Sequence, residues 1–234
     1  MAEEPLVREL ESDKSTSLVF IQGKVPFHPP DGFQDYFGPG PHWNFLKGGN
    51  GFKMAMQERI RDFPEADSPE DAMRQLLKGD TLKNDSVPAA IKDIYNEIER
   101  NGDVGGIIGY SEGALVAATF LVDQERQFRQ HGRPRQIKMC LMFTGWPAID
   151  PSGKGLLLAD EVEERIMVPS IHVIGSSDPF LPGAMALSAL FDEDTAILFD
   201  HGKGHTIPRD SQTVKELADT IRDTMQKACE GSEE

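Results

Sequence analysis

From Val104 onward the chain alternates short apolar runs with helical patterns, and this alternation constrains the fold more than any other feature. Apolar runs at 104–110, 137–144, 169–175 and 196–200 predict strands; segments 112–128, 161–166, 184–190 and 211–227 predict helices. Strands joined through helices form right-handed crossovers and a parallel sheet. We therefore expect an α/β fold, a single domain over 1–234 with a mostly parallel sheet flanked by helices, and an acidic flexible tail at about 229–234.

The part of the chain before Val104 is less regular. Residues 17–23 (SLVFIQG) predict a strand, because a β-branched and apolar run ends there in Gly. The stretch 24–51 is rich in Pro, Gly and aromatic residues and predicts a long irregular loop, which in a compact domain is usually functional. Helical patterns follow at 52–62, at 68–78 and, most clearly, at 88–100.

Charge and cysteine usage narrow the partners and the compartment. A net charge of −15 disfavours nucleic acid and anionic membrane surfaces as partners. Cys140 and Cys229 show neither metal-ligand spacing nor a disulfide framework, which indicates a reducing compartment. The first residues, MAEEPLVRELE, lack the apolar core of a signal peptide. We expect a cytoplasmic protein with no metal and no other cofactor.

The segment Gly109-Tyr110-Ser111-Glu112-Gly113 matches the G-x-S-x-G nucleophile elbow. In this motif a serine sits on a sharp, strained turn between a strand and a helix, and the glycines leave room for the close approach. Here an apolar strand pattern precedes the motif and an apolar helical pattern follows it. We therefore predict that Ser111 is a nucleophile at the carboxyl end of the sheet, where the helix N-terminus favours developing negative charge.

A serine nucleophile needs a base and an orienting acid, which follow the serine in the order acid, then histidine, in this fold. Asp178 comes directly after one predicted strand, and His205 comes after the next. The sequence thus predicts a triad of Ser111, Asp178 and His205. His201 remains the alternative base because it stands nearer to its strand, and His172, inside a strand, is predicted to be structural.

Further segments carry a more specific resemblance: VFIQGKVPFHPPDGF, DYFGPGPHWNF, GYSEGAL, IHVIGSSDPF and GKGHTIP. From Leu6 to the closing helix the chain resembles the fungal serine hydrolase family of α/β-hydrolases. Its GYSEGA elbow is more similar to the polyketide-releasing branch, as in lovastatin biosynthesis, than to the general esterases. The resemblance implies an esterase or thioesterase of secondary metabolism. Its substrate would be an acyl ester, or an acyl thioester held by a carrier protein, with a polyketide synthase as a possible partner.

The resemblance also reveals a missing element. Family members begin with a strand that ends in a His-Gly loop, whereas this chain begins at the helix that follows it, LVRELE. That strand normally lies between the 17–23 strand and the nucleophile strand. Its loop supplies one oxyanion-hole N–H, and the backbone N–H of Glu112 supplies the other. Losing one such donor costs about 10²–10³ in rate. Two explanations stay open: a truncated start, which we favour because all triad residues are present, or a weakly active member.

Aromatic residues provide candidate walls for an acyl pocket. The loop contributes Phe33, Tyr36, Phe37, Trp43 and Phe45. From this region and from the later strand ends we select Trp43, Trp146 and Phe180 as predicted substrate contacts, although packing at the sheet edge would explain any one of them equally well. Two alternatives to a polyketide-pathway hydrolase remain: a general short-acyl carboxylesterase, and a catalytically impaired binding protein.

Overall fold

Four parallel strands form the central sheet of the computed structural model, which describes residues 5–28, 34, 38–48, 65–77 and 82–230. In spatial order they are β3 (Gly106–Tyr110), β4 (Met139–Phe143), β5 (Ser170–Ile174) and β6 (Ala196–Asp200). Every residue of β4 and β5 is buried, whereas the outer strands β3 and β6 are partly exposed. β4 is therefore a continuous apolar run, as expected of a parallel strand covered on both faces, whereas β5 also buries Ser170 and His172.

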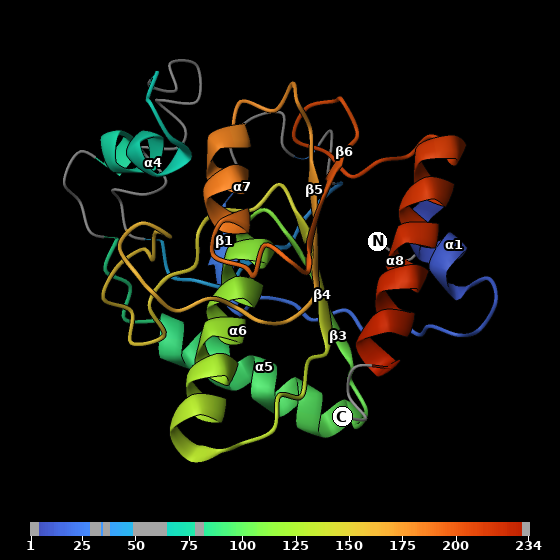
Figure 1. Ribbon diagram of the computed structural model, residues 1–234, viewed down its shortest axis with the longest axis horizontal. Coiled ribbons are helices and arrows are strands. Elements are labelled where there is room, and N and C mark those ends of the chain that lie inside the picture. Colours follow the sequence, from blue (N-terminus) through green and yellow to red (C-terminus); the bar gives the residue numbers. More distant parts are fainter. Residues whose placement is uncertain (1–4, 29–33, 35–37, 49–64, 78–81, 231–234) are drawn as a thin grey trace.

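Helices cover both faces of this sheet (Figure 1). On one face lie α1 (Pro5–Glu11) and α8 (Ser211–Glu230), which pack against each other. On the other face lie α5 (Val87–Asn101), α6 (Glu112–His131) and α7 (Leu181–Ser188), and α4 (Pro69–Leu77) packs against α7. Each face encloses its own cluster of buried apolar side chains. The α/β fold with a parallel sheet flanked by helices is confirmed.

Most predicted elements appear within a few residues of their expected bounds, but two predictions were wrong. Residues 17–23 form no strand. In Figure 1 the chain after α1 instead passes from the α8 side of the sheet to the α5 side, and Val19 and Phe20 remain about half exposed. β3 pairs only with β4 among the described strands, so residues 17–23 are not joined to its other edge. Strand propensity is realised only through pairing with a neighbour, and residues 17–23 pair with none of the described strands.

The second wrong prediction is the helix at 161–166. Ile166 instead forms a bridge with Phe191, and its backbone N–H donates to the carbonyl of Leu190. The preceding carbonyls are satisfied by a side chain, since the Arg165 guanidinium donates to the carbonyls of Ala159 and Val162. These contacts use the backbone groups that a helix would have paired with each other.

The predicted loop at 24–51 contains a short antiparallel pair, β1 (Val25–Phe27) and β2 (His42–Asn44), which the sequence did not indicate. The predicted helix at 52–62 lies outside the described residues. Helix α8 continues to Glu230, so the first two residues of the expected flexible tail are helical. None of the described helices is both long enough and apolar enough to cross a bilayer.

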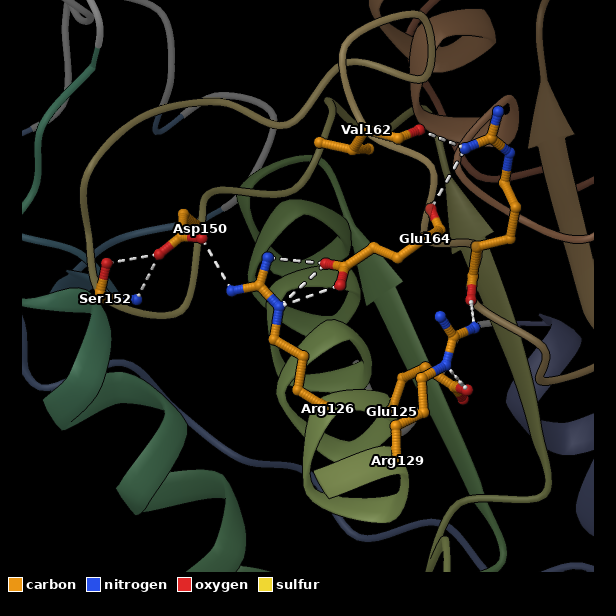
Figure 2. A network of polar contacts seen from close by, with 8 residues as sticks. Glu125, Arg126, Arg129, Asp150, Ser152, Val162 and Glu164 are labelled. Atoms are coloured by element: carbon orange, nitrogen blue, oxygen red, sulfur yellow. Dashed lines mark hydrogen bonds and ion pairs between the residues drawn. The ribbon is translucent and has the colours of Figure 1, made fainter. Parts of the chain in front are cut away.

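Ion pairs fix the long connection between β4 and β5 to helix α6 (Figure 2). Arg126 of α6 binds Asp150 at 2.7 Å and Glu164 at 2.6 Å, so it joins the two ends of this connection. One residue earlier, the buried carboxylate of Glu125 binds Arg129 and Arg135. A buried carboxylate needs such partners, because an unpaired charge away from water is strongly destabilising.

Candidate active site

Ser111 lies on a sharp turn between β3 and α6. Its backbone has φ 54° and ψ −115°, a conformation that L-residues rarely adopt and that persists only when the surroundings impose it. The N–H of Ser111 donates to the carbonyl of Phe143 on the neighbouring strand. A Cβ at Gly109 would lie 2.4 Å from the Cα of Ala114, so only glycine fits there. A Cβ at Gly113 would have no described atom within 4 Å apart from the adjacent backbone of its own helix, so this glycine has no comparable steric role.

Asp178 lies in the turn between β5 and α7, and its side chain is 1% exposed. One carboxylate oxygen, Oδ1, accepts the backbone N–H of Phe180 at 2.8 Å, and the Asp178 carbonyl accepts the N–H of Leu181. Because the helix start holds Oδ1 in this way, the second oxygen, Oδ2, points to another partner.

His205 lies in the loop after β6, and close packing brings this loop against the turn that carries Asp178. A Cβ at Gly175 would lie only 2.0 Å from the carbonyl oxygen of Lys203, so glycine is required at this contact. The N–H of Ser177 donates to the same carbonyl at 3.1 Å. The two loops are thus joined through their backbones, and the side chains of Asp178 and His205 face each other.

The three predicted triad side chains form one chain of hydrogen bonds. Nδ1 of His205 lies 2.9 Å from Oδ2 of Asp178, and Nε2 lies 3.1 Å from Oγ of Ser111. An ionised carboxylate only accepts, so Nδ1 carries the proton and Nε2 is left free to accept the Ser111 hydroxyl proton. Residues 111, 178 and 205, far apart in the sequence, therefore meet in the geometry of a nucleophile, a base and an orienting acid.

Two other histidines do not take part in this contact. His201, the alternative base, makes no hydrogen bond to Ser111, and burial lowers its pKa, which favours a neutral ring. His172 lies inside β5 with Nε2 3.0 Å from the Ser170 hydroxyl, and burial lowers its pKa to about 3. Its position agrees with the structural role predicted for it.

The aromatic residues predicted to contact substrate occupy different environments. Trp43 is 38% exposed on β2, whereas Trp146 is 2% exposed and lies in the core beside Phe180. The Phe180 ring in turn contacts the His205 ring, with centroids 4.9 Å apart. Phe180 thus packs against the imidazole and Trp146 packs behind it, and their contact with substrate remains a prediction. Phe33, Tyr36 and Phe37 lie outside the described residues.

Sequence reasoning missed two contacts made by the variable residues of the elbow. The phenol of Tyr110 donates to the backbone carbonyl of His205 at 3.1 Å, and the two rings lie 5.4 Å apart. The Glu112 carboxylate accepts backbone N–H groups from Phe45 and Leu46. The only sequence signal was the position of these residues, because their partners lie far away along the chain.

Comparison with known proteins identifies the family of this chain. The family model described as serine hydrolase (FSH1) matches residues 6–217, and this range includes all three side chains of the hydrogen-bonded chain. The chain belongs to the FSH1 serine hydrolase family. The resemblance to this serine hydrolase family, seen in the sequence segments, is therefore confirmed.

Several relatives of this FSH1-family member are fungal. Esterase FPY3 of Fusarium mangiferae is 30% identical over 62% of this chain and 68% of its own length. Hydrolase phiM of a fungal species (strain ATCC 74256) is 28% identical, over 56% of this chain and 64% of its own length. Esterase FUS5 of Gibberella fujikuroi is 26% identical over 89% of this chain and 73% of its own length. The chain thus spans about two thirds of the length of FPY3 and of phiM.

Among solved structures, the monoacylglycerol lipase of Paleococcus ferrophilus is similar with a TM-score of 0.44 and 15% identity. That superposition covers 61% of this chain and 76% of the lipase.

Proposed function

We propose that this chain hydrolyses carboxylic esters or thioesters through Ser111, with His205 as general base and Asp178 as the residue that orients it. The observation that carries the proposal is the hydrogen-bonded chain from Oγ of Ser111 through His205 to the buried Asp178, built on a strained elbow. The esterase names of FPY3 and FUS5 support the bond type.

In the first half of the reaction, Nε2 of His205 takes the hydroxyl proton while Oγ of Ser111 attacks the acyl carbonyl carbon. The negative charge moves to the carbonyl oxygen, which in this proposal the backbone N–H of Glu112, at the start of α6, stabilises. The tetrahedral intermediate then collapses. The bond to the leaving alcohol or thiol breaks, and His205 returns the proton to that group, which leaves an acyl ester on Ser111.

In the second half, a water molecule attacks the acyl-enzyme and His205 accepts its proton. Collapse of this intermediate breaks the bond between Oγ and the acyl carbon, and the proton on His205 returns to Ser111. The products are the free carboxylic acid and the regenerated hydroxyl. Asp178 stays ionised throughout, since its role is to hold the Nδ1 proton and to stabilise the imidazolium.

For the substrate we propose an acyl ester or a carrier-bound acyl thioester of fungal secondary metabolism, such as a polyketide chain. The GYSEGA form of the elbow and the hydrolase and esterase names of the fungal relatives support this assignment. With a net charge of −15, long-range attraction would not steer an acidic carrier protein, so docking would require a local contact patch.

The experiment that tests the proposal is labelling with a fluorophosphonate, which reacts covalently with activated serines. We expect one adduct by intact mass, mapped to Ser111, and none in Ser111→Ala. Circular dichroism on the same samples establishes that both proteins are folded. A folded wild-type chain without an adduct would contradict the proposed activity.

A second candidate function is binding of an acyl ligand without turnover. The observation in its favour is that β3, which carries the elbow, is an outer strand of the described sheet. Saturable binding of an acyl thioester without acylation of Ser111 would favour this candidate. Hydrolysis of short model esters with no preference for longer chains would instead favour a general carboxylesterase.

A further inference from the structure

The Glu112 carboxylate receives two consecutive backbone N–H groups from a segment far away in the sequence. Phe45 donates to Oε2 at 3.1 Å, and Leu46 donates to Oε1 at 3.4 Å. Each oxygen has its own donor, and hydrogen bonds to an ionised acceptor are stronger than those between neutral groups. Leu46 as a whole is only 7% exposed, and the N–H of a buried residue needs a hydrogen-bond partner.

The segment held in this way follows β2 and is fixed at its other end as well. The N–H of Lys47 donates to the Ser86 hydroxyl at 2.9 Å, and the Asn84 side chain donates to the Lys47 carbonyl. Ser86 is the N-cap of α5, and Asn84 lies two residues before it. Residues 45–47 therefore lie between two helix starts, and Glu112 provides the attachment to the helix that carries the nucleophile.

Glu112 also has a second part in the site, because its backbone N–H is the proposed oxyanion donor. The direction of that N–H depends on ψ of Ser111, which is held at −115° in a strained conformation. Such a conformation persists when surrounding contacts over-determine it. Two hydrogen bonds to the Glu112 side chain restrict the same residue whose amide must point at the reacting carbonyl oxygen.

We infer that the Glu112 side chain is a positioning residue, which holds the oxyanion donor in place by anchoring it to the backbone of Phe45 and Leu46. This inference rests on the proposed hydrolase function. It deepens that function by assigning a role to the second variable residue of the elbow. The two N–H donors also offset the negative charge that the carboxylate brings near the developing oxyanion.

The test is Glu112→Gln, which keeps the length of the side chain. Its amide oxygen can accept one N–H, but its NH₂ group would oppose the other, so one hydrogen bond is lost. With a short model ester we expect kcat to fall about tenfold or more, because small displacements of transition-state donors are costly in rate. We expect KM to stay within about twofold, since the N–H acts mainly on the transition state.

Glu99→Gln is the matched control. Glu99 is an exposed residue of α5, and its replacement removes the same charge away from the elbow. We expect its kcat to equal that of the wild type. Hydrogen exchange measured by mass spectrometry supplies a readout independent of turnover: the amides of Phe45 and Leu46 should lose protection in Glu112→Gln and keep it in Glu99→Gln.

Three results would overturn the inference. Unchanged kcat in Glu112→Gln with faster exchange at residues 45 and 46 would show that the contact is only structural. Unchanged exchange at these residues would show that the contact does not hold them. A wild-type chain that does not hydrolyse the model ester would contradict the role of Glu112 together with the proposed function. That last failure is distinguishable, because it is seen in the wild type before any variant is compared.

Discussion

At the scale of single residues, the proposed base, His205, is held through its backbone as well as through its ring. Asp178 fixes the imidazole by accepting from Nδ1, while the phenol of Tyr110 donates to the carbonyl of His205. Tyr110 directly precedes Ser111, so one residue of the elbow links β3 to the loop that carries His205. We therefore expect the distance between Oγ of Ser111 and Nε2 of His205 to depend on this phenol as well as on the Asp178 carboxylate.

Replacing Tyr110 by Phe tests this dependence, because it removes only the hydroxyl and leaves the ring against His205. We expect kcat to fall roughly three- to tenfold as the base loop loosens, and the free energy of unfolding to fall by about 1 kcal/mol. Steady-state kinetics and urea denaturation measure the two effects.

Tyr95→Phe is the control for this prediction. The phenol of Tyr95 donates to Asp123 at 2.9 Å, in a contact between α5 and α6. Its removal should lower stability by a similar amount and leave kcat unchanged. Equal kcat losses in the two variants would mean that lost stability, and not the position of the base, explains the effect.

At the scale of elements, the steric demands of the elbow differ between its two glycines. Gly109→Ala places a Cβ 2.4 Å from the backbone of Ala114, and a helix backbone cannot give way cheaply. We expect a loss of roughly 1–3 kcal/mol in unfolding free energy, or more. Gly113→Ala should be neutral or stabilising by up to about 1 kcal/mol, since alanine favours helix. Denaturant titration of both variants measures the difference, and equal losses would contradict it.

The sequence predicted the elements of the site better than the contacts between them. Ser111, Asp178 and His205 could be located because each follows an apolar run that predicts a strand, and in a parallel sheet the ends of such strands meet at one edge. The choice of His205 over His201 depended on the path of a loop, which no local pattern encodes. The partners of Tyr110 and Glu112 lie 95 and 66 residues away, so periodicity could not indicate them.

The same reason explains the failed strand prediction at 17–23. Its residues have the composition of a strand, but a strand forms only by pairing with a neighbour, and residues 17–23 pair with none of the described strands. The helix predicted at 161–166 failed for a related reason, because Ile166 pairs with the distant residues Leu190 and Phe191. Local patterns succeed where an element makes its own hydrogen bonds, as in α8, and fail where the partner lies elsewhere.

At the scale of the whole molecule, the stability of the fold should depend on pH through His172, which is 1% exposed in the central strand β5. Burial lowers its pKa from 6.5 to about 3. Below pH 6.5 His172 therefore binds a proton in the unfolded chain but stays neutral in the folded chain. The contribution of His172 to the free energy of unfolding is fully present above pH 6.5 and decreases as the pH falls toward 3.

We expect the contribution of His172 to decrease by about 2 kcal/mol between pH 7 and pH 5. Urea denaturation at several pH values measures it. In His172→Gln, which does not titrate, the free energy of unfolding should change less over this range. An identical pH dependence in the variant would contradict the assignment to His172.

The packing of α1 on α8 has a consequence for the order in which the chain can assemble. Leu6 and Leu10 of α1 are buried in the same cluster as Leu217 and Ile221 of α8, and Arg222 donates to the carbonyl of Glu9. A ribosome makes α1 before α8, and the strands of the central sheet lie between them in the chain. The apolar side of α1 therefore stays without its α8 partner until α8 has been synthesised, so the α1–α8 layer can close only after all four strands of the described sheet have been made.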